Sequence, residues 1–182
     1  MDSKTKGMVM AGMVVLSLVL GLLAVLGSSW MTASEDGVEA NYSLSEAEVK
    51  ADLFGESVTM EMDYGEACDE GDEDEPCELA TAGMIGQIGL WVGIVMAVLF
   101  AAMMILPMAG IDAMDGMPDI AQKIVSWGAG GMMLLGAIGW LILKPEMDDD
   151  AISLGMSFFM AIIAGVLGLA APAMDMFVEA DE

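Results

Sequence analysis

The stretch that decides the fold lies at residues 82–106 and reads AGMIGQIGLWVGIVMAVLFAAMMIL, without a charged side chain. A helix needs about 20 residues to cross the hydrocarbon core of a bilayer, so this stretch is long enough to span one. Inside that core, backbone polar groups find partners only within a helix or a closed barrel. We therefore expect a transmembrane helix over residues 82–106.

Three more uncharged apolar stretches of similar length lie at residues 7–27, 124–143 and 152–171. The uncharged core of the first is longer than the roughly 7–15 residues of a signal-peptide h-region, so we expect a retained helix. Together the four stretches predict an all-α integral membrane fold, a four-helix transmembrane bundle that forms a single membrane domain over residues 1–182.

The connections between these spans predict the orientation. Lys4 and Lys6 precede the first span, and the positive-inside tendency places that side in the cytoplasm. Both termini, the connection 107–123 and the tail 172–182 are then cytoplasmic, whereas residues 28–81 and the short connection 144–151 are external. We expect this arrangement in the plasma membrane.

The charge of the chain limits its partners. It carries 29 Asp and Glu against five Lys and Arg, a net charge of −24. Nucleic acid is excluded because phosphate binding needs clustered cations. A polybasic contact with anionic lipid headgroups is excluded for the same reason. Adaptation to salt is the simplest explanation of the surplus carboxylates, since salt screens their repulsion.

The external segment 28–81 is long enough to fold. Residues 57–64 alternate between apolar and polar side chains, which predicts a half-buried strand. Residues 38–42 offer a partner strand with a similar alternation. The run Ser45-Glu46-Ala47-Glu48 resembles a capping box and predicts a short helix over about residues 46–54.

Both cysteines of the chain, Cys68 and Cys77, lie in an acidic segment at residues 66–78. A pair confined to one external segment predicts a disulfide in an oxidising compartment. Because like charges repel and extend a chain, we expect the rest of this segment to be poorly ordered. Its carboxylates leave weak binding of Ca²⁺ or Mg²⁺ open, with these candidate ligands: Asp69, Glu70, Asp72 and Asp74.

The spans hold no ionisable side chain, so we expect no catalytic residue, no cofactor and no enzymatic activity. Gln87 is their one strongly polar side chain, and we expect it to form an interhelical hydrogen bond. Gly89 and Gly93 lie one turn apart and predict a close helix contact, within the bundle or with another subunit. Trp30 and two other tryptophans near span ends suit the membrane–water interface, while Trp91 is expected to pack inside.

Four spans, Trp30 after the first and the pair Cys68 and Cys77 before the second make the chain resemble the claudin and peripheral-myelin-protein superfamily. This family places a Gly-Leu-Trp shortly before its first cysteine. No such motif precedes Cys68 in this chain, and Tyr64 stands nearest that position. The resemblance implies a non-enzymatic role in cell-surface contact or lateral assembly through the first external loop. Its partners would be the lipid bilayer and further copies of the chain.

A second hypothesis is an accessory subunit. The glycine ridge of Gly89 and Gly93 would then pack against a larger channel, transporter or enzyme in the membrane.

Overall fold

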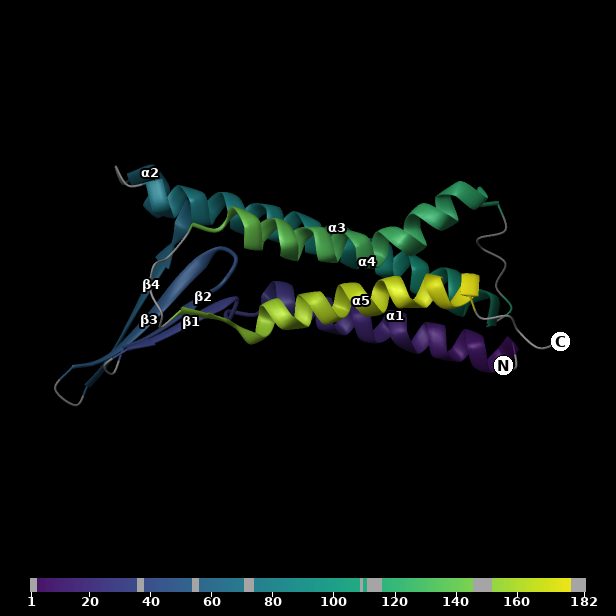
Figure 1. Ribbon diagram of the computed structural model, residues 1–182, viewed down its shortest axis with the longest axis horizontal. Coiled ribbons are helices and arrows are strands. Elements are labelled where there is room, and N and C mark those ends of the chain that lie inside the picture. Colours follow the sequence, from purple (N-terminus) through teal and green to yellow (C-terminus); the bar gives the residue numbers. More distant parts are fainter. Residues whose placement is uncertain are drawn as a thin grey trace.

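A computed structural model of the protein describes residues 3–35, 38–53, 56–70, 74–108, 110, 116–145 and 152–177. Four long helices form a bundle (Figure 1), and each is long and apolar enough to cross a membrane. They are α1 (Ser3–Leu26), α3 (Asp74–Met108), α4 (Asp119–Leu143) and α5 (Met156–Phe177). The start of α1 and the end of α5 lie at one end of the bundle, and a β-sheet lies at the other.

The four predicted spans are confirmed as helices, with shifted ends. Helix α3 begins at Asp74, inside the acidic segment, instead of at residue 82. Helix α5 begins at Met156 and not at residue 152, because residues 152–154 form a strand. Both α3 and α5 continue past the prolines near their ends.

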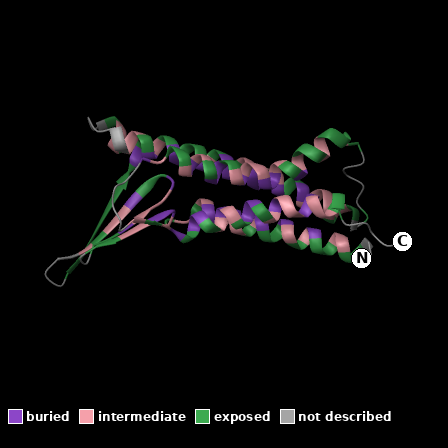
Figure 2. Cartoon of the chain, viewed as in Figure 1, coloured by how far each residue is buried: buried purple, intermediate pink, exposed green. Residues whose placement is uncertain are grey.

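Small residues line the helix contacts inside the bundle, whereas many large apolar side chains are exposed on its outside. Figure 2 shows buried and exposed residues alternating along the four long helices. In the contact of α3 with α4, a Cβ atom on Gly89 would collide with the backbone of Gly136. Between α1 and α5, the Ser17 hydroxyl donates a hydrogen bond of 2.6 Å to the Ala164 carbonyl oxygen. Such close backbone approach is how helices associate where no hydrophobic effect operates between them.

The sheet has five antiparallel strands in the order β4-β3-β2-β1-β5. Four come from the segment between α1 and α3, and the short fifth comes from the connection between α4 and α5. Their bounds are β1 (Met31–Glu35), β2 (Val38–Tyr42), β3 (Glu46–Leu53), β4 (Glu56–Asp63) and β5 (Ile152–Leu154). The bundle and strands in the segment between α1 and α3 were expected, but a sheet of five strands that also draws on the connection between α4 and α5 was not.

The helix expected over residues 46–54 is wrong, because residues 46–53 form β3; Phe54 lies outside the described residues. The Ser43 hydroxyl accepts the N–H groups of Ser45 and Glu46 at 3.1 and 2.9 Å, which makes a tight turn and not a helix cap. Strand β3 then pairs with β2 on one side and β4 on the other. These ladders outweigh the local capping signal, because they pair the backbone of residues 47–51 on both sides.

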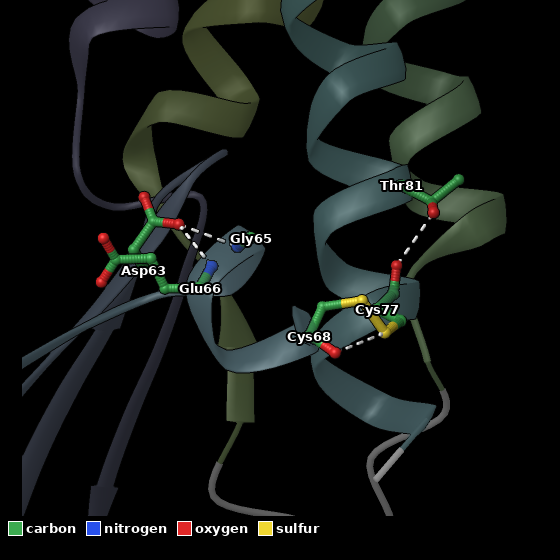
Figure 3. The surroundings of a disulfide bond; sticks show 6 residues. All are labelled: Asp63, Gly65, Glu66, Cys68, Cys77 and Thr81. Carbon is green, nitrogen blue, oxygen red and sulfur yellow. Dashed lines mark hydrogen bonds between the residues drawn. A yellow bond between two sulfur atoms is a disulfide. The ribbon is translucent and has the colours of Figure 1, made fainter. Parts of the chain in front are cut away.

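The described parts of the acidic segment, residues 66–70 and 74–78, are helical. A short helix, α2 (Tyr64–Glu70), follows β4, and the Asp63 carboxylate accepts the N–H groups of Gly65 and Glu66 at its start (Figure 3). The predicted disulfide is confirmed: Cys68 in α2 is bonded to Cys77 in the first turns of α3. The bridge therefore joins two helices, where an extended chain was expected.

The burial of three tryptophans differs from what the sequence predicts. Trp30 and Trp140 are fully buried and pack against each other and against Phe158, where the sheet meets the bundle. Trp91, expected inside, is 45% exposed on the outer surface of α3. Burial of the Trp30 ring is possible because its indole N–H donates a 2.9 Å hydrogen bond to the Ala24 carbonyl oxygen.

Candidate functional site

The sheet has one apolar and one polar face. Residues directly opposite each other on paired strands share a face, and the strand register aligns apolar residues into rows. One such row crosses all five strands: Met62, Ala47, Tyr42, Met31 and Leu154. The next row on the other face is polar: Glu61, Glu48, Asn41, Thr32 and Ser153.

Strand β4 is one of the two edge strands of this sheet, opposite β5, and is the most exposed part of it. The predicted strand at residues 57–64 is confirmed. Its half-buried character is wrong, because all eight residues of β4 are exposed. Met60, Met62 and Val58 are 62%, 45% and 41% exposed. The expected partner strand at residues 38–42 is also a strand, although β3 lies between it and β4.

Tyr64 fixes the bundle-side end of β4. The ring of Tyr64 is buried. Its backbone N–H donates a 3.0 Å hydrogen bond to the Ser45 carbonyl oxygen, and its hydroxyl donates one to the Ser43 carbonyl oxygen. Burial raises the pKa of the Tyr64 hydroxyl above its ordinary value, and Tyr42 and Glu46 raise it further. The exposed strand is thereby anchored on the turn between β2 and β3.

The polar face is acidic and carries one described cation, Lys50. Its ammonium group lies 2.8 Å from the Glu48 carboxylate, and that hydrogen bond raises the pKa of Lys50. Glu48 also lies directly opposite Glu61 in the ladder of β3 and β4. Like charges opposite each other destabilise a sheet, and Lys50 offsets that repulsion.

The glycine ridge of α3 is used inside the bundle. Gly89 lies against Gly136, and a Cβ atom on Gly93 would lie 2.5 Å from the Met133 side chain. Both contacts are made with α4, so the ridge does not face an outside subunit. The accessory hypothesis would need a surface other than this ridge, and it stays a prediction.

Gln87 does not form the interhelical hydrogen bond expected of it. Its side chain makes no hydrogen bond to any residue that the structure describes. It instead lines an open cavity at the sheet end of the bundle, together with Trp91 one turn further along α3.

The candidate cation ligands fall largely outside what the structure describes. Asp69 lies in α2, Asp72 is not described, and the side chains of Glu70 and Asp74 are not described. Among described residues, no group of three or more potential ligands is close enough to hold a metal ion.

Sequence reasoning missed β3, where it predicted a helix, and the contribution of β5 to the sheet. The signal for β3 was present, because Ala47, Val49 and Ala51 alternate with charged residues in the manner of a strand. No comparable signal marks β5, which has only three residues. Its pairing with β1 is a tertiary contact between segments about 120 residues apart, as the Thr32 and Ser153 hydroxyls, 3.1 Å apart, illustrate.

Comparison of the chain with protein-family models and with curated proteins found no match. The likeness to claudins therefore stays a prediction, based on Trp30, the cysteine pair and the arrangement of four helices.

Proposed function

We propose that this chain is a non-enzymatic four-span membrane protein, claudin-like, whose copies contact one another through the segment at residues 28–81. The observation that carries the proposal is strand β4, an exposed sheet edge with an apolar stripe of Val58, Met60 and Met62. A long, flat and partly apolar edge is a template for pairing with another strand.

The outside of the bundle supports the membrane location. Ile142, Leu135 and Val95 are among many large apolar side chains exposed on the described helices. Exposing such a surface to water is unfavourable, whereas lipid tails solvate it well. The bundle has the length and the surface of a multi-pass membrane protein.

The orientation follows from the two ends of the bundle. Lys4 and Lys6 belong to the start of α1, at the end away from the sheet (Figure 1). The disulfide of Cys68 with Cys77 lies at the sheet end, and disulfides persist in oxidising compartments. Both features favour a sheet on the outside of the plasma membrane and termini in the cytoplasm.

The sequence of β4 suits antiparallel pairing with the β4 of a second copy. If Met60 lies opposite Met60 of the second copy, the apolar residues meet, and Glu61 and Asp63 each face a hydroxyl. The resulting pairs are Val58 with Met62, Thr59 with Glu61, and Ser57 with Asp63. A register centred on Glu61 would instead place two carboxylates opposite each other, which is destabilising.

Apart from the mutual repulsion of its three carboxylates, nothing within β4 opposes this pairing. Its ladder with β3 is continuous from Asp63 to Glu56, without a proline or a bulge. Prolines, bulges and inward charges are the usual devices that prevent edge pairing. A two-fold pairing of this kind buries the same patch on both copies and closes after two subunits.

Cysteine crosslinking tests the register in membranes that contain the full chain. We expect Met60→Cys to form a disulfide-linked dimer on mild oxidation, because two cysteines directly opposite lie within bonding distance. Val58→Cys and Met62→Cys should each crosslink poorly alone but form a mixed dimer when both are present. The native cysteines are already bonded to each other and do not interfere.

The matched control is Thr59→Cys, which sits next to Met60 on the polar face and would lie opposite Glu61. Dimers formed equally by Met60→Cys and Thr59→Cys, or by neither, would contradict the proposed contact. Loss of the Met60→Cys dimer on dilution into excess lipid would show random collision instead of association.

Labelling with a membrane-impermeant maleimide tests the orientation. Ser34→Cys, exposed on β1, should react in intact cells, whereas Ile120→Cys, exposed at the start of α4, should react only after permeabilisation. The reverse pattern would overturn the proposed orientation.

A further inference from the structure

A small open cavity lies where the bundle meets the sheet. It measures about 300 Å³ and lies between the end of α1, the turn joining β2 to β3 and the outer surface of α3. Residues 25–28, residues 43–46, Gln87 and Trp91 line it. Volumes of this order accommodate small ligands or the headgroup of a larger one.

Gln87 gives the cavity an unused hydrogen-bonding group. Its amide offers two donors and one acceptor oxygen, and none is bonded to a residue that the structure describes. A polar group within an apolar helix is unfavourable without a partner. The amide of Gln87 is not buried, so water or a ligand that enters the cavity can supply that partner.

The rest of the lining favours a neutral, hydroxyl-rich ligand. Ser28, Ser43 and Ser45 add hydroxyl groups, and Glu46 adds an acceptor that repels anions. The lining holds no Lys or Arg, so a phosphate would find no counter-charge. Hydroxyl groups, which donate and accept, match this set of side chains.

Trp91 supplies an aromatic surface beside the polar groups. It lies four residues after Gln87, so both side chains are on one face of α3, and nearly half of its surface is exposed. A pyranose ring has an apolar face of C–H groups that packs on an indole, while its hydroxyl groups remain free at the rim. Gln87 can thus bond the hydroxyl groups of a sugar, while Trp91 packs on the apolar face of its ring.

We propose that this cavity binds the glycosyl headgroup of a neutral glycolipid in the leaflet on the sheet side. A lipid is favoured over a free saccharide because Leu26, 74% exposed, continues the cavity lining onto the apolar outside of the bundle. There the acyl chains lie against α1 and α3. This inference rests on the bundle spanning a membrane, as proposed above, but not on pairing of β4.

Native mass spectrometry of the full chain tests the inference, with protein purified in a zwitterionic detergent that carries no sugar. The probe is monogalactosyl diacylglycerol, compared with phosphatidylcholine, phosphatidylglycerol and diacylglycerol of the same chains. We expect the galactolipid to be retained about ten-fold more than each of the other three, as two or three additional hydrogen bonds predict.

Substitutions assign the effect to the cavity. Gln87→Leu and Trp91→Leu should each lower galactolipid retention about five-fold, while Trp91→Phe keeps an aromatic face and most of the binding. Trp127→Leu is the matched control, because Trp127 has similar exposure (38%) at the opposite end of the bundle. Melting temperatures of the variants should match that of the wild type.

Three results would overturn the inference. Equal retention of diacylglycerol or phosphatidylcholine by the wild type would show that no glycosyl group is recognised. Undiminished binding by both Gln87→Leu and Trp91→Leu would place the lipid elsewhere. Full competition by methyl galactoside would identify a site for free sugars. None of these results would alter the Met60→Cys crosslinking, so the two proposals fail separately.

Discussion

The rings of Trp30 and Trp140 meet edge to face, with centroids 5.0 Å apart and an angle of 65° between their planes. Trp30 follows α1 and precedes the first strand of the sheet, whereas Trp140 lies in the last turns of α4. Phe158 of α5 completes the cluster, 6.0 Å from Trp30. The sheet is therefore fixed to the bundle by aromatic contacts between Trp30 and two of the four long helices, α4 and α5.

Replacing Trp140 tests this attachment. We expect Trp140→Ala to lower the free energy of unfolding by about 3–5 kcal/mol, because a large buried ring leaves a cavity behind. Trp127→Ala in the same helix is the control and should change it by less than about 1 kcal/mol, since Trp127 is exposed. Denaturant titration in detergent micelles measures both, and equal losses would contradict the role given to the cluster.

The contact between Gly89 and Gly136 predicts a strong difference between two glycine substitutions. Gly89→Ala should destabilise the bundle by about 1–3 kcal/mol, because its Cβ atom would collide with the backbone of α4. Gly131→Ala meets no atom within 4 Å and should be neutral or stabilising by up to about 1 kcal/mol. Thermal unfolding in detergent measures the stability of both variants. A loss of stability for Gly89→Ala no larger than that for Gly131→Ala would refute the close approach of α3 and α4.

The disulfide predicts a local effect on α2. Removing it by the double change Cys68→Ala and Cys77→Ala should destabilise the folded state by about 2–3 kcal/mol in the chain-entropy model. Hydrogen exchange should then accelerate in residues 64–80 and stay unchanged in residues 124–140. Reductant should have the same effect on the wild type and none on the double variant; faster exchange throughout α4 would show that the bridge supports the whole bundle.

Tyr64 predicts a loss of stability at alkaline pH. Because burial raises the pKa of its hydroxyl, the folded state favours the neutral form. The associated stability is complete below the unfolded pKa of about 10 and decreases as the pH rises above it. Tyr64→Phe should therefore show a smaller decrease in melting temperature between about pH 9 and pH 11 than the wild type.

Tyr42→Phe is the control for that measurement. It retains Tyr64 and its burial, the largest cause of the raised pKa, and should keep most of the alkaline decrease of the wild type. An equal decrease in the Tyr64→Phe variant and the wild type would show that the Tyr64 hydroxyl does not carry the effect.

The four spans were predictable from the sequence, because an uncharged run of about 20 apolar residues has one stable arrangement in a bilayer. The disulfide was predictable because the chain has only two cysteines and both lie in one connection. The strand at residues 57–64 followed from its strict alternation. Each of these features depends on composition or spacing within one short segment.

The capping box at Ser45 shows where such reasoning fails. It is a local signal, and the segment it precedes also alternates between charged and apolar residues, so helix and strand compete. Pairing with β2 and β4 decides the competition, since only neighbouring strands can complete the backbone hydrogen bonds of β3. The expectations for Trp30 and Trp91 were wrong for a similar reason. Hydropathy indicates how far along a span a residue lies, but not which side of the helix it is on.

By itself, then, the sequence determined which segments are helices long enough to cross a membrane and which two sulfur atoms are bonded. The tertiary structure alone decided that β5 joins the sheet, that Gly89 faces α4, and that Gln87 opens onto a cavity. The physical reason is the distance along the sequence between the residues that make contact. Helices and short rings are stabilised by contacts within one segment, whereas sheet order, helix faces and cavities arise only when distant segments meet.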